Sequence, residues 1–408
     1  MLQYTSDFLK HSTSLSTDFT EFVKKLPLYN YLEPVFSKDL YQEAIDKLTK
    51  FTRIIHLGTG GSSLGPQALY SVTDAPSREF IFFDNIDPDA LTVRLRNVDF
   101  SKTGLLVVSK SGNTAETLVQ LATFKKIYDD KNLKLQDHLV IITQTDDNAL
   151  HTFAKNNNIV VVPHHNQIGG RFAVFAEVGM LSGLLMGLDM DAFRKGAQDA
   201  LTAFEKATRS CPILEVACFL AKSKAHPVMF PYADKLKLYS AWFAQLWAES
   251  LGKKNESGER FGSTPIQALG ATDQHSQLQL YLDGPQDKFF TFLEVEQKID
   301  FDVVNLNIDH PAYKPLRGHS LQELLKAELH ATYETMRAHA LPLRLVTVPV
   351  INTYYLAQLM LNAVLETLAV SIIWDVNPFN QPAVEEGKVL ALKFLNDKNS
   401  NLYKCVNE

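Results

Sequence analysis

The chain of 408 residues contains little cysteine: Cys211, Cys218 and Cys405, with no C-x-x-C spacing. An odd number of cysteines without paired spacing argues against a disulfide framework and a thiolate zinc site, and it favours a reducing compartment. The sequence also lacks a long run of Lys or Arg, and its formal net charge is −6 at pH 7. Because nucleic-acid binding needs clustered positive charge, we expect no nucleic-acid partner.

Long hydrophobic runs are scarce as well. The first residues contain no apolar segment of the signal-peptide type. The most apolar long stretch, 172–188, carries Glu177 and is too short to cross a bilayer. We therefore expect a cytoplasmic protein with no membrane partner. The chain is longer than the roughly 250–300 residues at which a single core stops growing, which predicts two domains.

From residue 53 onward, short apolar runs alternate with longer amphipathic stretches, whereas residues 1–50 have helical spacing throughout. This alternation predicts parallel strands with helices on both faces, in two successive α/β halves. We expect strands at 53–58, 79–84, 105–109, 139–143, 159–163, 226–232, 288–295 and 341–350. Helical patterns cover 172–224, 235–251, 274–282, 320–339 and 354–374.

Two polar loops follow expected strands of the first half. HLGTGGSSLGP, residues 56–66, fits only part of a dinucleotide-binding fingerprint, because Ser63 stands where the third glycine belongs. SKSGNT, residues 109–114, places three hydroxyls and a lysine just before an expected helix, whose free N–H groups favour an anion. A helix cap needs only one hydroxyl, so we favour a phosphate-binding loop over simple capping, with no metal ion.

Four further positions carry candidate chemistry. Arg171 follows two glycines and can stabilise an oxyanion, although a buried structural ion pair is equally open. Gln245 and Glu249 share a helix face, and Glu249 is either a base or a solvated helix-end residue. His275 can exchange a proton at physiological pH, but a lone histidine is more often structural, and Lys388 is ordinarily a surface residue.

In their order along the chain, six motifs resemble those of the glucose-6-phosphate isomerase family in its short, bacterial-type form. They are GTGGSSLGP, SKSGNTAET, GGRF, QLWAESLGK, ATDQHSQLQL and PFNQPAVEEGK, and they span the chain from Gly58 to Lys388. The resemblance implies two sugar-isomerase domains, each a doubly wound, mostly parallel sheet flanked by helices. It also implies reversible conversion of glucose 6-phosphate to fructose 6-phosphate, without a metal or an organic cofactor.

The resemblance suggests residue boundaries for the two domains and the two terminal segments. We expect an N-terminal helical segment over 1–45 that packs on the second domain, a first domain over 46–190 with the phosphate loop, a second domain over 191–385 with the base, and a C-terminal helix over 386–408.

The same resemblance implies a role for each site residue. Glu249 would move a proton between carbon 2 and carbon 1 of a cis-enediol(ate), and Arg171 would stabilise its negative oxygen. His275, assisted by Lys388, would open the sugar ring, and it would come from the partner subunit of a homodimer. The other family positions would hold the substrate: its phosphate at Ser109, Lys110, Ser111 and Thr114, and its sugar at Gly61, Ser62, Gln245 and Gln381.

Three other interpretations stay open on the sequence. An isomerase that also accepts mannose 6-phosphate would need nearly the same site. A non-catalytic sugar-phosphate sensor would need the loop at 109–114 but not Glu249, His275 or Lys388. An enzyme that uses NAD would rest on the incomplete glycine fingerprint at 58–65.

Overall fold

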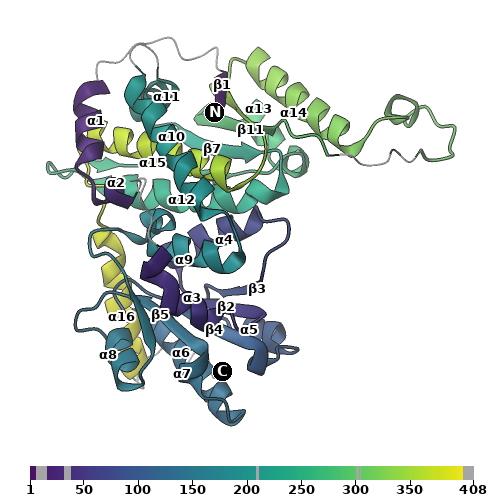
Figure 1. Ribbon diagram of the computed structural model, residues 1–408. Coiled ribbons are helices and arrows are strands. Elements are labelled where there is room, and N and C mark those ends of the chain that lie inside the picture. The colour runs from purple at the N-terminus through teal and green to yellow at the C-terminus, as the bar shows by residue number, and fades with distance from the viewer. Residues whose placement is uncertain (6–15, 32–37, 208–210, 300–302, 304, 398–408) are drawn as a thin grey trace.

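The computed structural model describes residues 1–5, 16–31, 38–207, 211–299, 303 and 305–397. Two α/β domains lie one above the other in Figure 1, with the first domain below and the second above. One apolar core passes through both, because buried side chains of α4 (Leu64–Ser71), α9 (Glu177–Met186) and α12 (Lys237–Leu251) belong to a single cluster. The two domains therefore share a packed junction.

The first sheet is parallel throughout and has the strand order β3-β2-β4-β5-β6. Its strands are continuous apolar runs because helices cover both faces. The strands are β2 (Arg53–Leu57), β3 (Glu79–Phe83), β4 (Thr103–Val108), β5 (Leu139–Thr143) and β6 (Val160–Pro163). One face packs on α3 (Gln42–Leu48), α4 and α9, and the other on α5 (Pro88–Leu95), α6 (Ala115–Asp130), α7 (Leu135–His138) and α8 (Ala149–Asn156).

The second sheet has the order β1-β12-β11-β7-β10, and only β1 runs antiparallel to its neighbour. Its strands are β1 (Gln3–Thr5), β7 (His226–Pro231), β10 (Ile266–Gln267), β11 (Lys288–Val295) and β12 (Leu343–Val348). The shared core holds α10 (Met190–Lys206), α11 (Pro212–Ser223), α12 and α15 (Thr353–Ile373) on one side, and α13 (Leu278–Asp283) and α14 (Leu321–Ala338) cover the other. The two-domain α/β fold with helices on both faces of parallel sheets is confirmed.

Smaller elements complete the chain. Helices α1 (Ser16–Lys24) and α2 (Pro27–Tyr31) lie near α10, where Phe19 and Phe204 meet edge to face at 5.4 Å. A two-stranded ribbon, β8 (Lys253–Lys254) with β9 (Arg260–Phe261), follows α12. Residues 305–320, before α14, extend away from the body on the right of Figure 1.

The helical expectation for residues 1–50 is wrong at Gln3–Thr5, which form strand β1 against β12. Tertiary contacts override the local pattern there, because the Leu2 N–H donates to Gln358 Oε1 at 3.2 Å and Asn362 donates to the Tyr4 hydroxyl. The expected helical region over 172–224 is divided into the 3₁₀ helix η4 (Gly170–Phe175), α9, α10 and α11.

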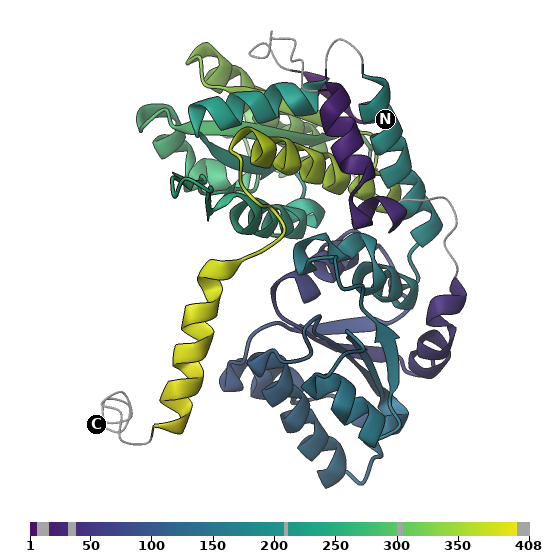
Figure 2. The same cartoon turned by 90° about the vertical axis from the view of Figure 1, so that its left-hand side faces the viewer.

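Helix α15 is long and apolar enough to cross a membrane by length and composition alone. Of its most apolar window, 83% is buried inside the protein, as expected of a core helix. Helix α16 (Glu385–Asn396) is the opposite case, because it stands apart from both domains in Figure 2 and none of its residues is buried. The expected C-terminal helix thus begins at Glu385 and ends at Asn396, and residues 398–408 lie outside the described part.

Candidate active site

The direction of winding in the first sheet reverses between β2 and β4. The chain leaves β2 toward β3 on one side and leaves β4 toward β5 on the other. Open α/β sheets bind ligands outside the carboxyl ends of the strands at such a reversal. The 3₁₀ turn η2 (Gly60–Ser62) follows β2, and the loop 109–114 follows β4. Both predicted binding loops therefore lie at the carboxyl ends of the two strands that flank the reversal.

The η2 turn lies directly against the backbone that carries Arg171. A Cβ on Gly61 would stand 2.1 Å from the carbonyl carbon of Gly170 and 2.5 Å from the amide nitrogen of Arg171. Only glycine permits this approach. Gln245 of α12 covers the same turn, and its buried Oε1 has no hydrogen-bond partner among the described residues. A hydroxyl group of a ligand would supply the missing donor.

The loop after β4 brings its hydroxyl groups together. Ser109 is buried, and its Oγ lies 2.8 Å from Oγ1 of Thr114. Thr114 precedes α6 but makes no side-chain cap, and Asn113 Oδ1 instead accepts from the Ala149 N–H at 2.9 Å. Neither residue therefore caps α6, which argues against the simple capping alternative. The uncapped N-terminus of a 16-residue helix faces the loop and favours an anion.

Arg171 links the two domains at the base of this crevice. The side chain comes from η4, is 1% exposed, and donates from Nη1 to Glu249 Oε2 at 2.9 Å and from Nε to Ser250 Oγ at 2.9 Å. Glu249 lies in the last turn of α12, where the helix dipole disfavours a carboxylate, so the guanidinium offsets that cost. Its side chain remains 35% exposed and is accessible from the crevice.

Arg171 also holds the segment before α16. Its Nη1 donates to Gln381 Oε1 at 3.2 Å, and its Nη2 donates to the carbonyls of Pro378 and Asn380. Lys253 donates to the same Asn380 carbonyl and to Asn380 Oδ1. Two cations thus position the segment 378–381, which carries Gln381.

The electrostatic balance of the crevice is positive. Arg171 acts electrostatically on both Lys110 and Lys253, and Glu249 is the carboxylate that acts on Arg171 and Lys253. Burial, followed by repulsion from Arg171, lowers the pKa of Lys253 to about 8, and the same two causes lower the pKa of Lys110. A bound anion would relieve this repulsion, because it favours the charged form of each lysine.

Two predicted residues lie elsewhere. His275, in the 3₁₀ helix η6 (Thr272–His275), is exposed and makes no hydrogen bond or ion pair within the described ranges. Lys388, on α16, is also exposed and pairs only with Glu385 at 2.7 Å among described residues. The single chain therefore assembles Arg171, Glu249, Gln245 and Gln381 with both loops, and it does not bring His275 or Lys388 to them.

Comparison of the whole sequence with known proteins identifies the family of the chain. The sequence matches the profile of the family described as phosphoglucose isomerase over residues 30–405. It is 36% identical over 361 residues to a "Glucose-6-phosphate isomerase" of Thermus thermophilus, across 87% of this chain and 86% of that protein. The chain belongs to the phosphoglucose isomerase family.

Solved structures agree with this conclusion. A "hypothetical protein TT0462", also from Thermus thermophilus, superposes with a TM-score of 0.85 at 30% identity, covering 97% of this chain and all of that one. A glucose-6-phosphate isomerase from Chlamydia trachomatis has a TM-score of 0.76 at 22% identity, over 90% of this chain and 75% of that one. The latter similarity confirms the fold: two doubly wound α/β domains.

Three residues outside the predicted set contact parts of the candidate site: Ser250, Lys253 and His56. Ser250 and Lys253 lie in the motif ESLGK, which the sequence indicates as part of a site. No local sequence pattern indicates that Ser250 bonds to Arg171 or that Lys253 bonds to Asn380. His56 lies in the first quoted loop, and its partner is the carbonyl of Ser62 at 2.8 Å. In this phosphoglucose isomerase family member, the contacts of all three residues are tertiary or cross a tight turn.

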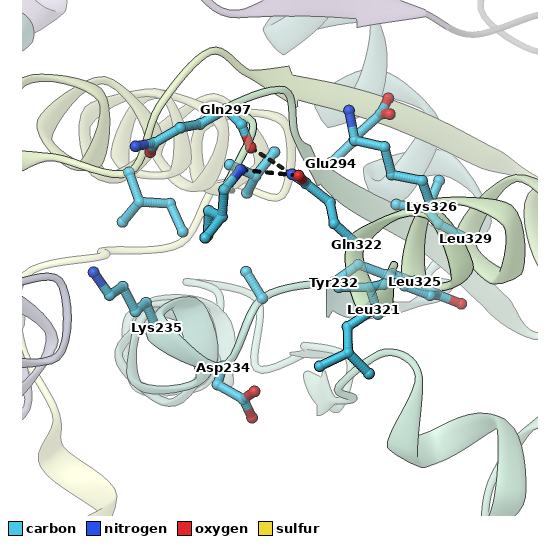
Figure 3. Close-up of a pocket in the computed structure, with 14 residues that line it drawn as sticks. Tyr232, Asp234, Lys235, Glu294, Gln297, Leu321, Gln322, Leu325, Lys326 and Leu329 are labelled. Atoms are coloured by element: carbon cyan, nitrogen blue, oxygen red, sulfur yellow. Dashed lines mark hydrogen bonds between the residues drawn. The ribbon is translucent and has the colours of Figure 1, made fainter. Parts of the chain in front are cut away.

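The second sheet has its own winding reversal, between β7 and β11, and a cavity of about 390 Å³ lies at the carboxyl ends of these strands. Figure 3 shows its lining. Several polar groups there are already engaged: Gln322 with Gln297 and Ile299, Glu294 with His330, and Lys235 with Asp74. Lys235 and Lys326 also line the cavity, but its described lining contains no cluster of open hydroxyls like that of the loop 109–114.

Proposed function

We propose that the protein interconverts glucose 6-phosphate and fructose 6-phosphate, with Glu249 as the base. The ion pair between Arg171 and Glu249 carries the proposal, because it sets a base beside a permanent cation at the end of the crevice. Isomerisation through a cis-enediol(ate) needs both: a carboxylate to take the proton from carbon 2 and return it to carbon 1, and a cation for the oxygen that becomes negative.

Glu249 acts as a base through its carboxylate, whose Oε2 lies 2.9 Å from Nη1 of Arg171. Arg171 keeps its proton throughout, so it stabilises negative charge without competing as an acid. Its other contacts, to Ser250 and to the 378–380 carbonyls, hold the guanidinium in place before the substrate arrives. Such preorganisation lowers the barrier because the dipoles need not reorient during the reaction.

The phosphate of the substrate would bind at the loop 109–114 without a metal. Ser109, Ser111 and Thr114 offer hydroxyls, α6 offers uncapped N–H groups, and Lys110 offers charge. The sugar would lie between Gly61–Ser62 and the side chains of Gln245 and Gln381, where the unpaired Oε1 of Gln245 accepts a hydroxyl.

Ring opening by His275, assisted by Lys388, requires a second chain. His275 is exposed on the second domain, and α16 presents a row of exposed apolar side chains, including Val389, Leu392 and Leu395. Such a helix is unfavourable in water and is stabilised by burial against a partner. We propose a homodimer in which His275 of one protomer completes the site of the other. Cys211 and Cys218 form no disulfide within the described part of the chain, and we propose a reducing compartment such as the cytoplasm.

A coupled assay tests the reaction. Purified protein receives fructose 6-phosphate in EDTA, and glucose-6-phosphate dehydrogenase with NADP reports any glucose 6-phosphate formed. We expect turnover in EDTA. Folded protein without turnover would remove the isomerase proposal and favour the sugar-phosphate sensor, whereas product from mannose 6-phosphate would extend the substrate range.

Complementation tests the shared site. Glu249→Gln and His275→Ala are each expected to be inactive as pure dimers. Mixing them after brief unfolding and refolding yields heterodimers that hold one site with both native residues, so about a quarter of the activity returns. No recovery in a mixture shown to contain heterodimers would place His275 and Glu249 in the same protomer or remove His275 from the chemistry.

A further inference from the structure

His56 occupies a place where an apolar residue is expected. It lies in the central strand β2 and points to the same side of the sheet as Ile54, into the core shared by Ala68 and Leu69. The imidazole is fully buried and packs at 5.2 Å from the ring of Phe82. A buried polar ring is costly unless a hydrogen bond compensates it, so the contact that it makes needs a reason.

That contact is with the backbone of the η2 turn. His56 Nε2 lies 2.8 Å from the carbonyl oxygen of Ser62. A carbonyl can only accept, so Nε2 carries the proton and donates. Nδ1 has no hydrogen-bond partner in the described part of the chain, which fits an unprotonated nitrogen. Burial lowers the pKa of His56 to about 4, so this neutral tautomer persists at physiological pH.

The chain itself explains why Ser62 needs an external donor. The carbonyl of a residue entering a helix normally accepts from the N–H four positions later, as the Ser63 carbonyl does from Gln67 at 2.9 Å. Ser62 precedes the cap residue Ser63, and the helical pattern cannot extend back to it, because the residue four positions later, Pro66, has no N–H. His56 supplies the donor that Pro66 lacks, from the strand immediately before the turn.

We propose that His56 is a positioning residue that fixes the η2 turn, and through it both the sugar contact and Arg171. The turn at Gly61 touches the backbone of Gly170 and Arg171, so a shift of the turn moves the guanidinium relative to Glu249. This inference rests on the proposed isomerase function and adds to it a residue that touches neither substrate nor reacting atoms.

The test compares three variants with the wild type. His56→Leu removes the donor and keeps the bulk, whereas His56→Gln retains an N–H donor near the position of Nε2. His138 provides the matched control: it is also a buried imidazole on a backbone carbonyl, with Nδ1 2.9 Å from Thr103 O, but at the amino end of β4. His138→Leu removes an equivalent hydrogen bond away from the crevice.

We expect His56→Leu to lower kcat/KM for fructose 6-phosphate by about 10- to 100-fold, the scale of a small misplacement of catalytic groups. Inhibition by inorganic phosphate should be unchanged, because the loop 109–114 does not depend on His56. His56→Gln should recover most of the activity, and His138→Leu should lower the melting temperature while retaining kcat/KM.

Two outcomes overturn the inference while leaving the isomerase function intact: wild-type kcat/KM in folded His56→Leu, or an equal loss in His138→Leu. A wild type without turnover removes the function and this inference with it. Should His56→Leu fail to fold, ¹⁵N NMR of the wild-type histidines decides, with His56→Gln identifying the signal. A neutral ring protonated at Nε2 supports the proposal, and a ring protonated at Nδ1 contradicts it.

Discussion

The two sheets share the order of four parallel strands, β3-β2-β4-β5 and β10-β7-β11-β12, but the chemistry at their winding reversals differs. At the reversal in the first sheet, the chain places a glycine turn and a hydroxyl-rich loop, and it leaves the Gln245 acceptor and the helix α6 N-terminus open. At the reversal in the second sheet, the lining is largely apolar, and Gln322 and Glu294 are already engaged with Gln297 and His330. Topology therefore supplies a winding reversal in both domains, and the open hydroxyl and acceptor groups of the first make it the candidate site.

The test with the largest expected effect on kcat compares two carboxylates, Glu249 and Glu294. Glu249→Gln should lower kcat by about 100- to 10,000-fold with little change in KM, because a general base acts in the transition state. Glu294→Gln, in the second crevice, removes a carboxylate that is 12% exposed and bonded to His330, and it should leave kcat unchanged. Equal losses in the coupled assay would show that the effect follows from folding and not from the position of Glu249.

The same contrast shows what the sequence can predict. Strands β2, β3, β5 and β11 were predicted to within a residue, because each is a run of apolar residues long enough to fill a buried parallel strand. Strands β1 and β10 have three and two residues, too few to produce a pattern, and their pairing is set by tertiary contacts.

The candidate site also has parts that the sequence predicts and parts that it does not. The loops at 56–66 and 109–114 were recognisable because their residues are adjacent in sequence. The pairing of Arg171 with Glu249 joins residues 78 positions apart, and no local pattern records it. The roles of His275 and Lys388 came from the family resemblance alone, and the single chain leaves both in solvent.

A second test compares two buried arginines, Arg171 and Arg344, each paired with a glutamate. Arg171→Lys should lower kcat/KM by about 100- to 1,000-fold, since a lysine cannot hold Glu249, Ser250 and the 378–380 carbonyls together. Arg344 pairs with Glu366 at 2.7 Å inside the second domain, away from any crevice loop. Arg344→Lys keeps the charge but loses part of the hydrogen bonding to Glu366 and Thr291, so it should instead cost about 1.5–3 kcal/mol of stability, by urea unfolding, and preserve kcat in the folded fraction. The reverse pattern would contradict the division between the domains.

Acid stability provides a third test, specific to the first sheet. His56 has a pKa of about 4 when folded, below its ordinary 6.5, because burial outweighs the hydrogen bond to Ser62 and the charge of Asp84. Below pH 6.5 the unfolded chain binds a proton that the folded chain does not, so stability falls as the pH decreases toward 4. His56 should account for about 3 kcal/mol of this loss at pH 4. Unfolding of His56→Gln should depend correspondingly less on pH, and parallel curves would contradict a neutral, buried His56.

The smallest test compares the two crevices as anion sites. Ser109→Ala removes one hydroxyl from the phosphate loop and should raise KM about 10-fold with kcat nearly unchanged, the result expected for a bond to a charged group made equally in substrate and transition state. Lys326→Met removes a half-buried cation from the second crevice, and KM and inhibition by phosphate should stay at wild-type values, since the open donors that surround a phosphate at 109–114 are absent from that described lining. If phosphate inhibits Lys326→Met more weakly than Ser109→Ala, the proposed phosphate site is contradicted. That result would place the phosphate in the cavity of the second domain and leave the loop 109–114 as a structural turn.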